Sequence, residues 1–184
     1  MGIVTMVGVL FMRLSRDITD STLRFSGSLI TQAALDQTMQ VILPEIRSAS
    51  QANDGSYPIL EAGTSSLQFY SDVTQDGLFD LVRYYLEGST LKKGVVAPTG
   101  SPLAYVTSTE VLRDVVYDVI PGAQLFTYYD KTATSPDSTP LQQPVDVSKV
   151  RTIKITLVAN QGTTSTPSIT GVETQATIRN LRNK

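Results

Sequence analysis

The chain has 184 residues, of which 41% are hydrophobic and 17% are charged, so it can bury a sizeable core. It contains no His and no Cys, which excludes Ser-His-Asp and Cys-His catalysis, ordinary zinc sites and disulfides. The net charge is −2 and the cationic residues are scattered, so no surface for nucleic acid is expected. We therefore expect a folded protein that is not an enzyme, with no cofactor and no small-molecule substrate.

An apolar run opens the sequence. It covers residues 3–12, is interrupted only by Thr5, and ends before Arg13. This is about half of the roughly 20 residues that cross a bilayer, so the run suits part of a membrane helix, or alternatively a short helix packed on a core. We favour a stem for membrane insertion and assembly. Its candidate residues are Ile3, Val4, Val7, Val9, Leu10 and Phe11.

A second segment has helical periodicity. Leu35, Met39, Ile42 and Ile46 recur at the spacing of one face of an α-helix. The pattern predicts a helix over residues 28–52, with this apolar stripe packed against a sheet. Proline within the segment, at position 44, predicts a kink in a helix that continues beyond it.

After residue 55 the sequence changes to short alternating segments separated by turn residues, which is typical of antiparallel strands. We expect one antiparallel sheet within residues 57–180. The segment 110–120 fits both a helix and a strand, and we favour a helical turn that leads into extended chain. The predicted strands cover residues 57–60, 66–71, 78–86, 90–96, 103–106, 124–129, 150–159 and 171–178.

Two patterns are weak candidates for binding. Asp72 and Asp76 begin a sequence that resembles a calcium loop, but the twelfth position, where an EF-hand places a Glu, is Arg83. A hairpin turn is the better interpretation, so no metal is expected. The pairs Tyr84-Tyr85 and Tyr128-Tyr129 could form a platform for sugar rings, although strand alternation turns one tyrosine of each pair inward.

Five segments, taken in order, carry a family resemblance. They are Arg16-Asp17-Ile18; Glu45-Ile46-Arg47-Ser48-Ala49-Ser50; the hairpin from Phe69-Tyr70-Ser71-Asp72 to Val82-Arg83-Tyr84-Tyr85-Leu86; Phe126-Thr127-Tyr128-Tyr129-Asp130; and Val150 to Leu157 closing with Thr177-Ile178-Arg179-Asn180-Leu181. In this order the chain resembles type IV pilin-like proteins, closest to the J-type minor pseudopilins of type II secretion and related minor pilins. The family's mature chains carry a Glu soon after a leader Gly. That Glu is missing after Gly2, so either this sequence lacks an N-terminal part or this copy is not processed in the usual way.

The resemblance implies an α+β fold, with a long, interrupted N-terminal helical stem packed against an antiparallel β head. It divides the chain into an apolar stem, residues 1–27, and a soluble head, residues 28–184. It implies a structural subunit of a type IV pilus or type II secretion pseudopilus, with other pilin-like subunits and the membrane as partners. Its location would be the bacterial inner membrane with the head outside the cytoplasm, and then the pilus or cell surface. The alternative is a membrane-anchored module whose head binds a surface carbohydrate or another extracellular ligand.

Overall fold

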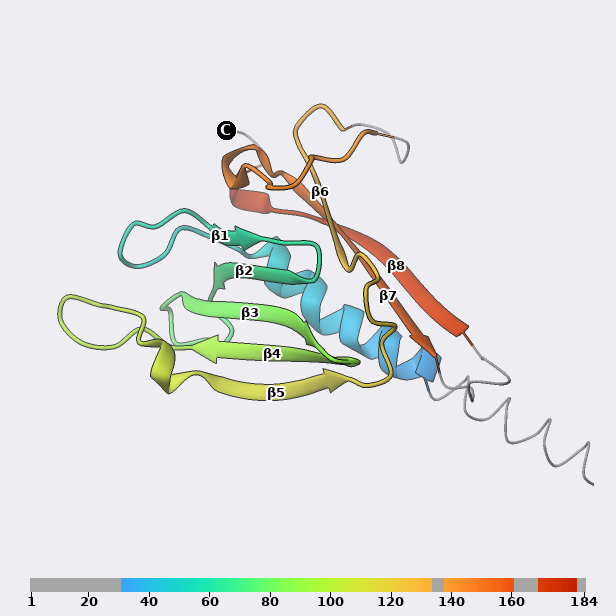
Figure 1. The fold of residues 1–184 in the computed structure, drawn as a ribbon. Helices are drawn as coiled ribbons and strands as arrows, with labels where there is room; N and C mark the ends of the chain where they lie inside the picture. Colours follow the sequence, from blue (N-terminus) through green and yellow to red (C-terminus); the bar gives the residue numbers. More distant parts are fainter. Residues whose placement is uncertain (1–30, 134–137, 161–168, 182–184) are drawn as a thin grey trace, which may run out of the picture.

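The computed structural model describes residues 31–133, 138–160 and 169–181. Within these residues, one α-helix covers residues 31–47 and eight strands form two antiparallel sheets (Figure 1). Both sheets keep their strands in chain order, as short connections between antiparallel strands favour.

The first sheet has five strands. They are β1 (Ile59–Ala62), β2 (Ser66–Ser71), β3 (Asp80–Glu87), β4 (Thr90–Val96) and β5 (Val111–Val116). The turn from β3 to β4 contains Gly88 at φ +60°, a backbone conformation that glycine adopts at little cost. Strands β1 and β5 form the two edges of this sheet.

The second sheet has three strands, β6 (Phe126–Tyr129), β7 (Thr152–Asn160) and β8 (Ile169–Thr177). Strand β7 alternates strictly, and Ile153, Ile155 and Leu157 on one face are fully buried. Strands β7 and β8 are paired along their length, as the sequence predicts. Three short 3-10 segments complete the described elements: η1 (Thr107–Thr109), η2 (Val147–Lys149) and η3 (Arg179–Leu181).

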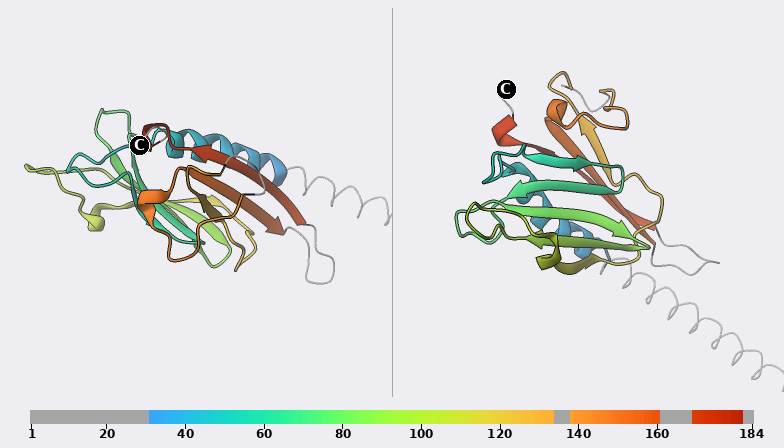
Figure 2. Two further views of the ribbon diagram at one scale, coloured as in Figure 1. Left: turned by 90° about the horizontal axis from the view of Figure 1, so that it is seen from above. Right: turned by 60° about the vertical axis from the view of Figure 1, so that its left-hand side comes forward.

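The helix lies across one face of the five-stranded sheet, and the second sheet lies beside it (Figures 1 and 2). The stripe Leu35, Met39, Ile42 and Ile46 is at most 4% exposed. It belongs to one core that includes Phe69 and Val82 of the first sheet and Ile153 of the second. Both sheets and the helix therefore share a single hydrophobic core.

The helix ends at residue 47 because its last carbonyls and the following backbone find other partners. The Ser48 hydroxyl donates to the carbonyl oxygens of Pro44 and Glu45. The Ser50 N–H donates to the carbonyl of Tyr70 in β2 and not back into the helix. The helix is therefore shorter than the predicted range of 28–52 at its C-terminal end, and it does continue past Pro44.

The predicted fold class is wrong. The described residues are mostly β rather than α+β, with eight strands in two sheets and one helix of residues 31–47, and this part of the chain contains no long helical stem. The single predicted sheet is also wrong, because the chain leaves the first sheet after β5. The stem proposed for residues 1–27 lies outside the described residues.

Two local predictions also fail. The segment 110–120 contains strand β5 and no helical turn, because pairing with β4 satisfies its backbone and suits its β-branched residues. The helical turn falls just before it, at η1. The expected strand at 103–106 is a loop that contributes only an isolated bridge between Thr99 and Ala104.

A charge on the helix stripe is expected to unfold the described fold. Ile46→Asp buries an unpaired carboxylate at a fully enclosed site, which we expect to cost about 3–5 kcal/mol or more. Val41→Asp in the same helix is the control, because Val41 is 48% exposed and its change should stay within about 1 kcal/mol. Chemical denaturation of both variants of the full chain measures this, and equal stability would contradict the packing described.

Candidate functional site

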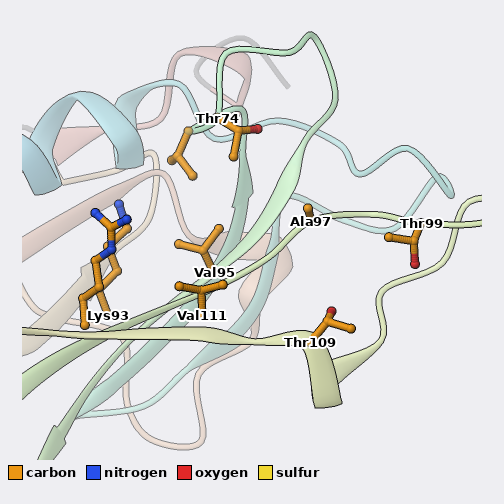
Figure 3. A pocket seen from close by; sticks show the side chains of 9 residues that line it. Thr74, Lys93, Val95, Ala97, Thr99, Thr109 and Val111 are labelled. Atoms are coloured by element: carbon orange, nitrogen blue, oxygen red, sulfur yellow. The ribbon is translucent and has the colours of Figure 1, made fainter.

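A hollow of about 410 Å³ lies on the helix-facing side of the five-stranded sheet (Figure 3). Its floor is apolar and belongs to neighbouring strands, since Val95 of β4 pairs directly with Val111 of β5. Threonine hydroxyls and two cations surround this floor. The lining residues are Val73, Thr74, Lys93, Val95, Ala97, Thr99, Thr109, Val111 and Arg113.

The hollow exists because the core covers only part of this sheet face. In β4, Leu91 is fully buried in the core, whereas Val95, four residues further on, is only half-buried. On the neighbouring edge strand, Val111 is 57% exposed. The row of apolar side chains that begins in the core at Leu91 therefore continues through Val95 to Val111, where no described residue covers it.

Asp80 fixes the loop on the opposite side of the hollow. This fully buried carboxylate accepts hydrogen bonds from the N–H groups of Val73 and Thr74, at 3.1 and 3.0 Å, and from the Thr74 hydroxyl at 2.9 Å. A carboxylate that accepts several donors holds their backbone firmly. Val73 and Thr74 are therefore held in place as a wall of the hollow.

A hydrogen-bonded group of three side chains marks the boundary between the core and the hollow. Glu45 of the helix accepts a hydrogen bond of 2.7 Å from the Tyr84 hydroxyl and forms an ion pair with Lys93. The side chains of Glu45 and Lys93 are each only 15% exposed. Burial raises the pKa of Tyr84 well above its usual range, and the charge of Glu45 raises this pKa further. Lys93 lines the hollow, but Glu45 therefore balances its charge.

Arg113 differs from the cations around it. Arg83 binds Glu110 on the opposite face of the sheet, and Lys92 binds Glu87. Arg113 lines the hollow, and its side chain forms no hydrogen bond or ion pair with any of the described residues. The hollow thus combines an apolar floor with one positive charge that no described carboxylate neutralises.

The sequence did not indicate this hollow. Val95, Val111 and Arg113 come together only when β5 is known to be a strand and its register with β4 is known. The ambiguous pattern of residues 110–120 concealed that register. The apolar residues of β5 were the available signal in the sequence, but their spacing alone fits a helix as well as a strand.

The sequence predicts a turn in the loop after β2, and the hydrogen bonds of this loop agree with it. The Asp72 carboxylate accepts from the N–H groups of Asp76 and Gly77, and the Asp76 carboxylate accepts from Leu78. Gly77 has φ +85°, as such a turn requires. Within the described ranges, no group of three or more His, Cys, Asp or Glu side chains is arranged to hold a metal ion.

Of the two tyrosine pairs, Tyr84-Tyr85 alternates as predicted, whereas both tyrosines of the pair Tyr128-Tyr129 are buried, so the weak candidate of a tyrosine platform gains no support. Tyr84, Tyr128 and Tyr129 are all buried, at most 5% exposed, and only Tyr85 reaches the surface. The Tyr128 hydroxyl donates to the carbonyl of Gly63 at 2.7 Å, so this tyrosine joins the two sheets. Arg83 lies over the Tyr85 ring at 4.2 Å from its centroid. Tyr128 and Tyr129 are both buried because strand β6 is enclosed on both faces.

The other predicted site residues fall into two groups. The helix stripe of Leu35, Met39, Ile42 and Ile46 lies in the core against both sheets. The stem residues proposed within 3–12 lie outside the described part of the chain. Over the described residues, no helix combines the length and the hydrophobicity that a membrane span needs.

No protein-family model matches the chain, and a search of curated proteins finds no match to it. The resemblance to pilin-like proteins therefore stays a prediction from the sequence.

The buried state of Tyr84 predicts a loss of stability at alkaline pH. Its pKa is raised in the folded protein, so its contribution is complete below the usual tyrosine pKa of ~10 and is lost above it, where only the unfolded chain ionises. The free energy of unfolding should fall by about 1.4 kcal/mol per pH unit from this residue. Urea unfolding between pH 8 and pH 11 should give a shallower decline for Tyr84→Phe than for the unchanged chain. Identical slopes would contradict the described environment.

Proposed function

We propose that the chain is a structural subunit of a pilin-like assembly, of the type IV pilus or type II secretion pseudopilus kind. It would join other pilin-like subunits through its apolar N-terminal segment, residues 3–12, and present the β head to the aqueous side. Its role would be structural and not catalytic. Its location would be the bacterial inner membrane and then the pilus, pseudopilus or cell surface.

One observation carries the proposal: the apolar segment precedes a helix that is fixed in the head. Thr31 and Leu35, in the first described turns of this helix, are already buried, at 3% and 0% exposure. A force on the chain before the helix would therefore act on the packed core of the head. This mechanical connection is what an assembly subunit needs, since contacts made by the N-terminal segment must hold the head in place.

The distribution of charge and chemical groups also supports a structural role. Residues 3–12 contain no charged side chain, so water is a poor environment for them and burial against lipid or a neighbouring subunit would stabilise them by about 25 cal/mol per Å². Association entropy offsets part of this gain. The absence of His and Cys from the whole chain leaves few groups for covalent or acid–base catalysis near neutral pH.

The alternative of a carbohydrate-binding head has lost its main support. It depended on exposed tyrosines, and three of the four are in the core. No other cluster of aromatic side chains on the described surface suggests sugar stacking: both rings of the pair Phe69–Tyr84 are buried, and in the pair Tyr70–Tyr105 the ring of Tyr70 is buried.

A charge in the apolar segment is expected to prevent assembly without affecting the head. Val7→Asp should reduce both membrane retention and cross-linking to neighbouring subunits by about tenfold or more, because a carboxylate in hydrocarbon is costly. The readouts are fractionation of cells that make the full chain and mass spectrometry of the cross-linked neighbours, which should have pilin-like sequences.

Val7→Leu is the matched control and should behave as the unchanged chain. The thermal melting of the head should be the same for both variants, because neither changes the described core. Membrane retention and cross-linking that survive Val7→Asp would contradict the proposal, as would cross-linked neighbours without apolar N-terminal segments.

A further inference from the structure

Strand β5 leaves an open edge on the five-stranded sheet. The opposite edge strand, β1, is partly covered, since η2 packs beside it and the side chain of Gln143 donates to the Ala62 carbonyl. Strand β5 pairs with β4 on one side only, and over the described residues no other backbone group bonds to Val111–Val116. Its outward N–H and C=O groups are available to a further strand.

The side chains of β5 are also unusually exposed. Val111 and Leu112 point to opposite faces of the sheet, and they are 57% and 50% exposed. On the helix-facing side, Val111 continues into the apolar floor that it shares with Val95. A strand added at this edge would cover both residues and one side of the hollow at the same time.

The charge at the edge indicates the chemistry of the added strand. Arg113 lies on the same face as Val111 and lacks an acidic partner among the described residues, while the neighbouring cation Lys93 is neutralised by Glu45. In a sheet, a residue directly opposite Arg113 would lie within reach of the guanidinium. A carboxylate at that position would form the ion pair that this face lacks.

The same strand of a second copy of the chain is a poor partner for this edge. Two identical antiparallel strands related by a two-fold axis normal to the sheet must keep equivalent faces together. Two registers give the greatest overlap. One places Arg113 opposite Arg113 of the other copy, and the other places Asp114 opposite Asp114. Like charges directly opposite each other are destabilising. The strand that pairs with β5 therefore has a different sequence from β5.

We infer that β5 and the adjoining hollow form a docking site for an extended, acidic–apolar peptide segment of another protein, which adds to the sheet as a sixth strand. A carboxylate of that segment lies opposite Arg113, and an apolar side chain two positions along lies opposite Val111 and enters the hollow. Main-chain hydrogen bonds supply affinity and the two side-chain positions supply specificity. This inference goes beyond the proposed function, because it uses no residue of the apolar N-terminal segment.

The test uses fluorescently labelled peptides of about eight alternating Thr and Val residues, in which one central position is either Glu or Lys. Anisotropy titration with the full chain should show binding of the Glu peptide with a Kd about tenfold lower than that of the Lys peptide. Arg113→Glu should reverse this order and Arg113→Gln should remove the preference. Lys131→Glu, which changes an exposed cation in a distant loop, is the matched control and should leave the order unchanged.

A second comparison separates strand addition from simple occupation of the hollow. The Glu peptide with alternate backbone amides N-methylated keeps its side chains but cannot pair as a strand, so its binding should be lost. The inference is overturned if the Glu peptide does not bind, if Arg113→Glu leaves the preference intact in a variant that melts normally, or if the N-methylated peptide binds equally well.

Discussion

The burial of one helix face between two sheets is the interaction on which the rest of the structure depends. Leu35, Met39, Ile42 and Ile46 each lose nearly all contact with water, which contributes about 1.5–3 kcal/mol per side chain. The two sheets share no strand, so their union relies on this helix, on side chains such as Tyr128 that bond across to the first sheet, and on backbone hydrogen bonds such as that from the Phe126 N–H to the Thr64 carbonyl. Without the stripe, neither sheet would have a closed hydrophobic face.

The same arrangement explains the candidate site. A single helix is narrower than a five-stranded sheet, so one side of the sheet face is left without cover beyond the Glu45–Lys93 ion pair. That uncovered area is the hollow, and its outer border is the open edge of β5. Glu45, Lys93 and the Tyr84 hydroxyl form a polar border where the apolar core ends. Within this border the charges of Glu45 and Lys93 are paired with each other.

Local sequence patterns predicted most of the individual elements. The helix stripe and strands β2, β3, β4 and β7 follow periodicities of 3.6 and 2 residues, and these depend only on neighbours in the chain. The failures have a common cause. In each case the outcome depends on what packs against the strand. The pattern of β5 fits a helix as well as a strand, and only its pairing decides between them. Tyr128 and Tyr129 are both buried because β6 is enclosed on both faces, which alternation within one strand cannot reveal.

The sequence by itself determined which residues are apolar, where the turns fall, and that the chain lacks the side chains for common catalytic and zinc chemistry. Only the tertiary structure decided that the strands divide into two sheets, that the helix covers part of one face, and that Val95, Val111 and Arg113 meet. The physical reason is that sheet division, cover and register depend on contacts between residues distant in the chain. Periodicity states which face of an element is apolar, but not what lies against it.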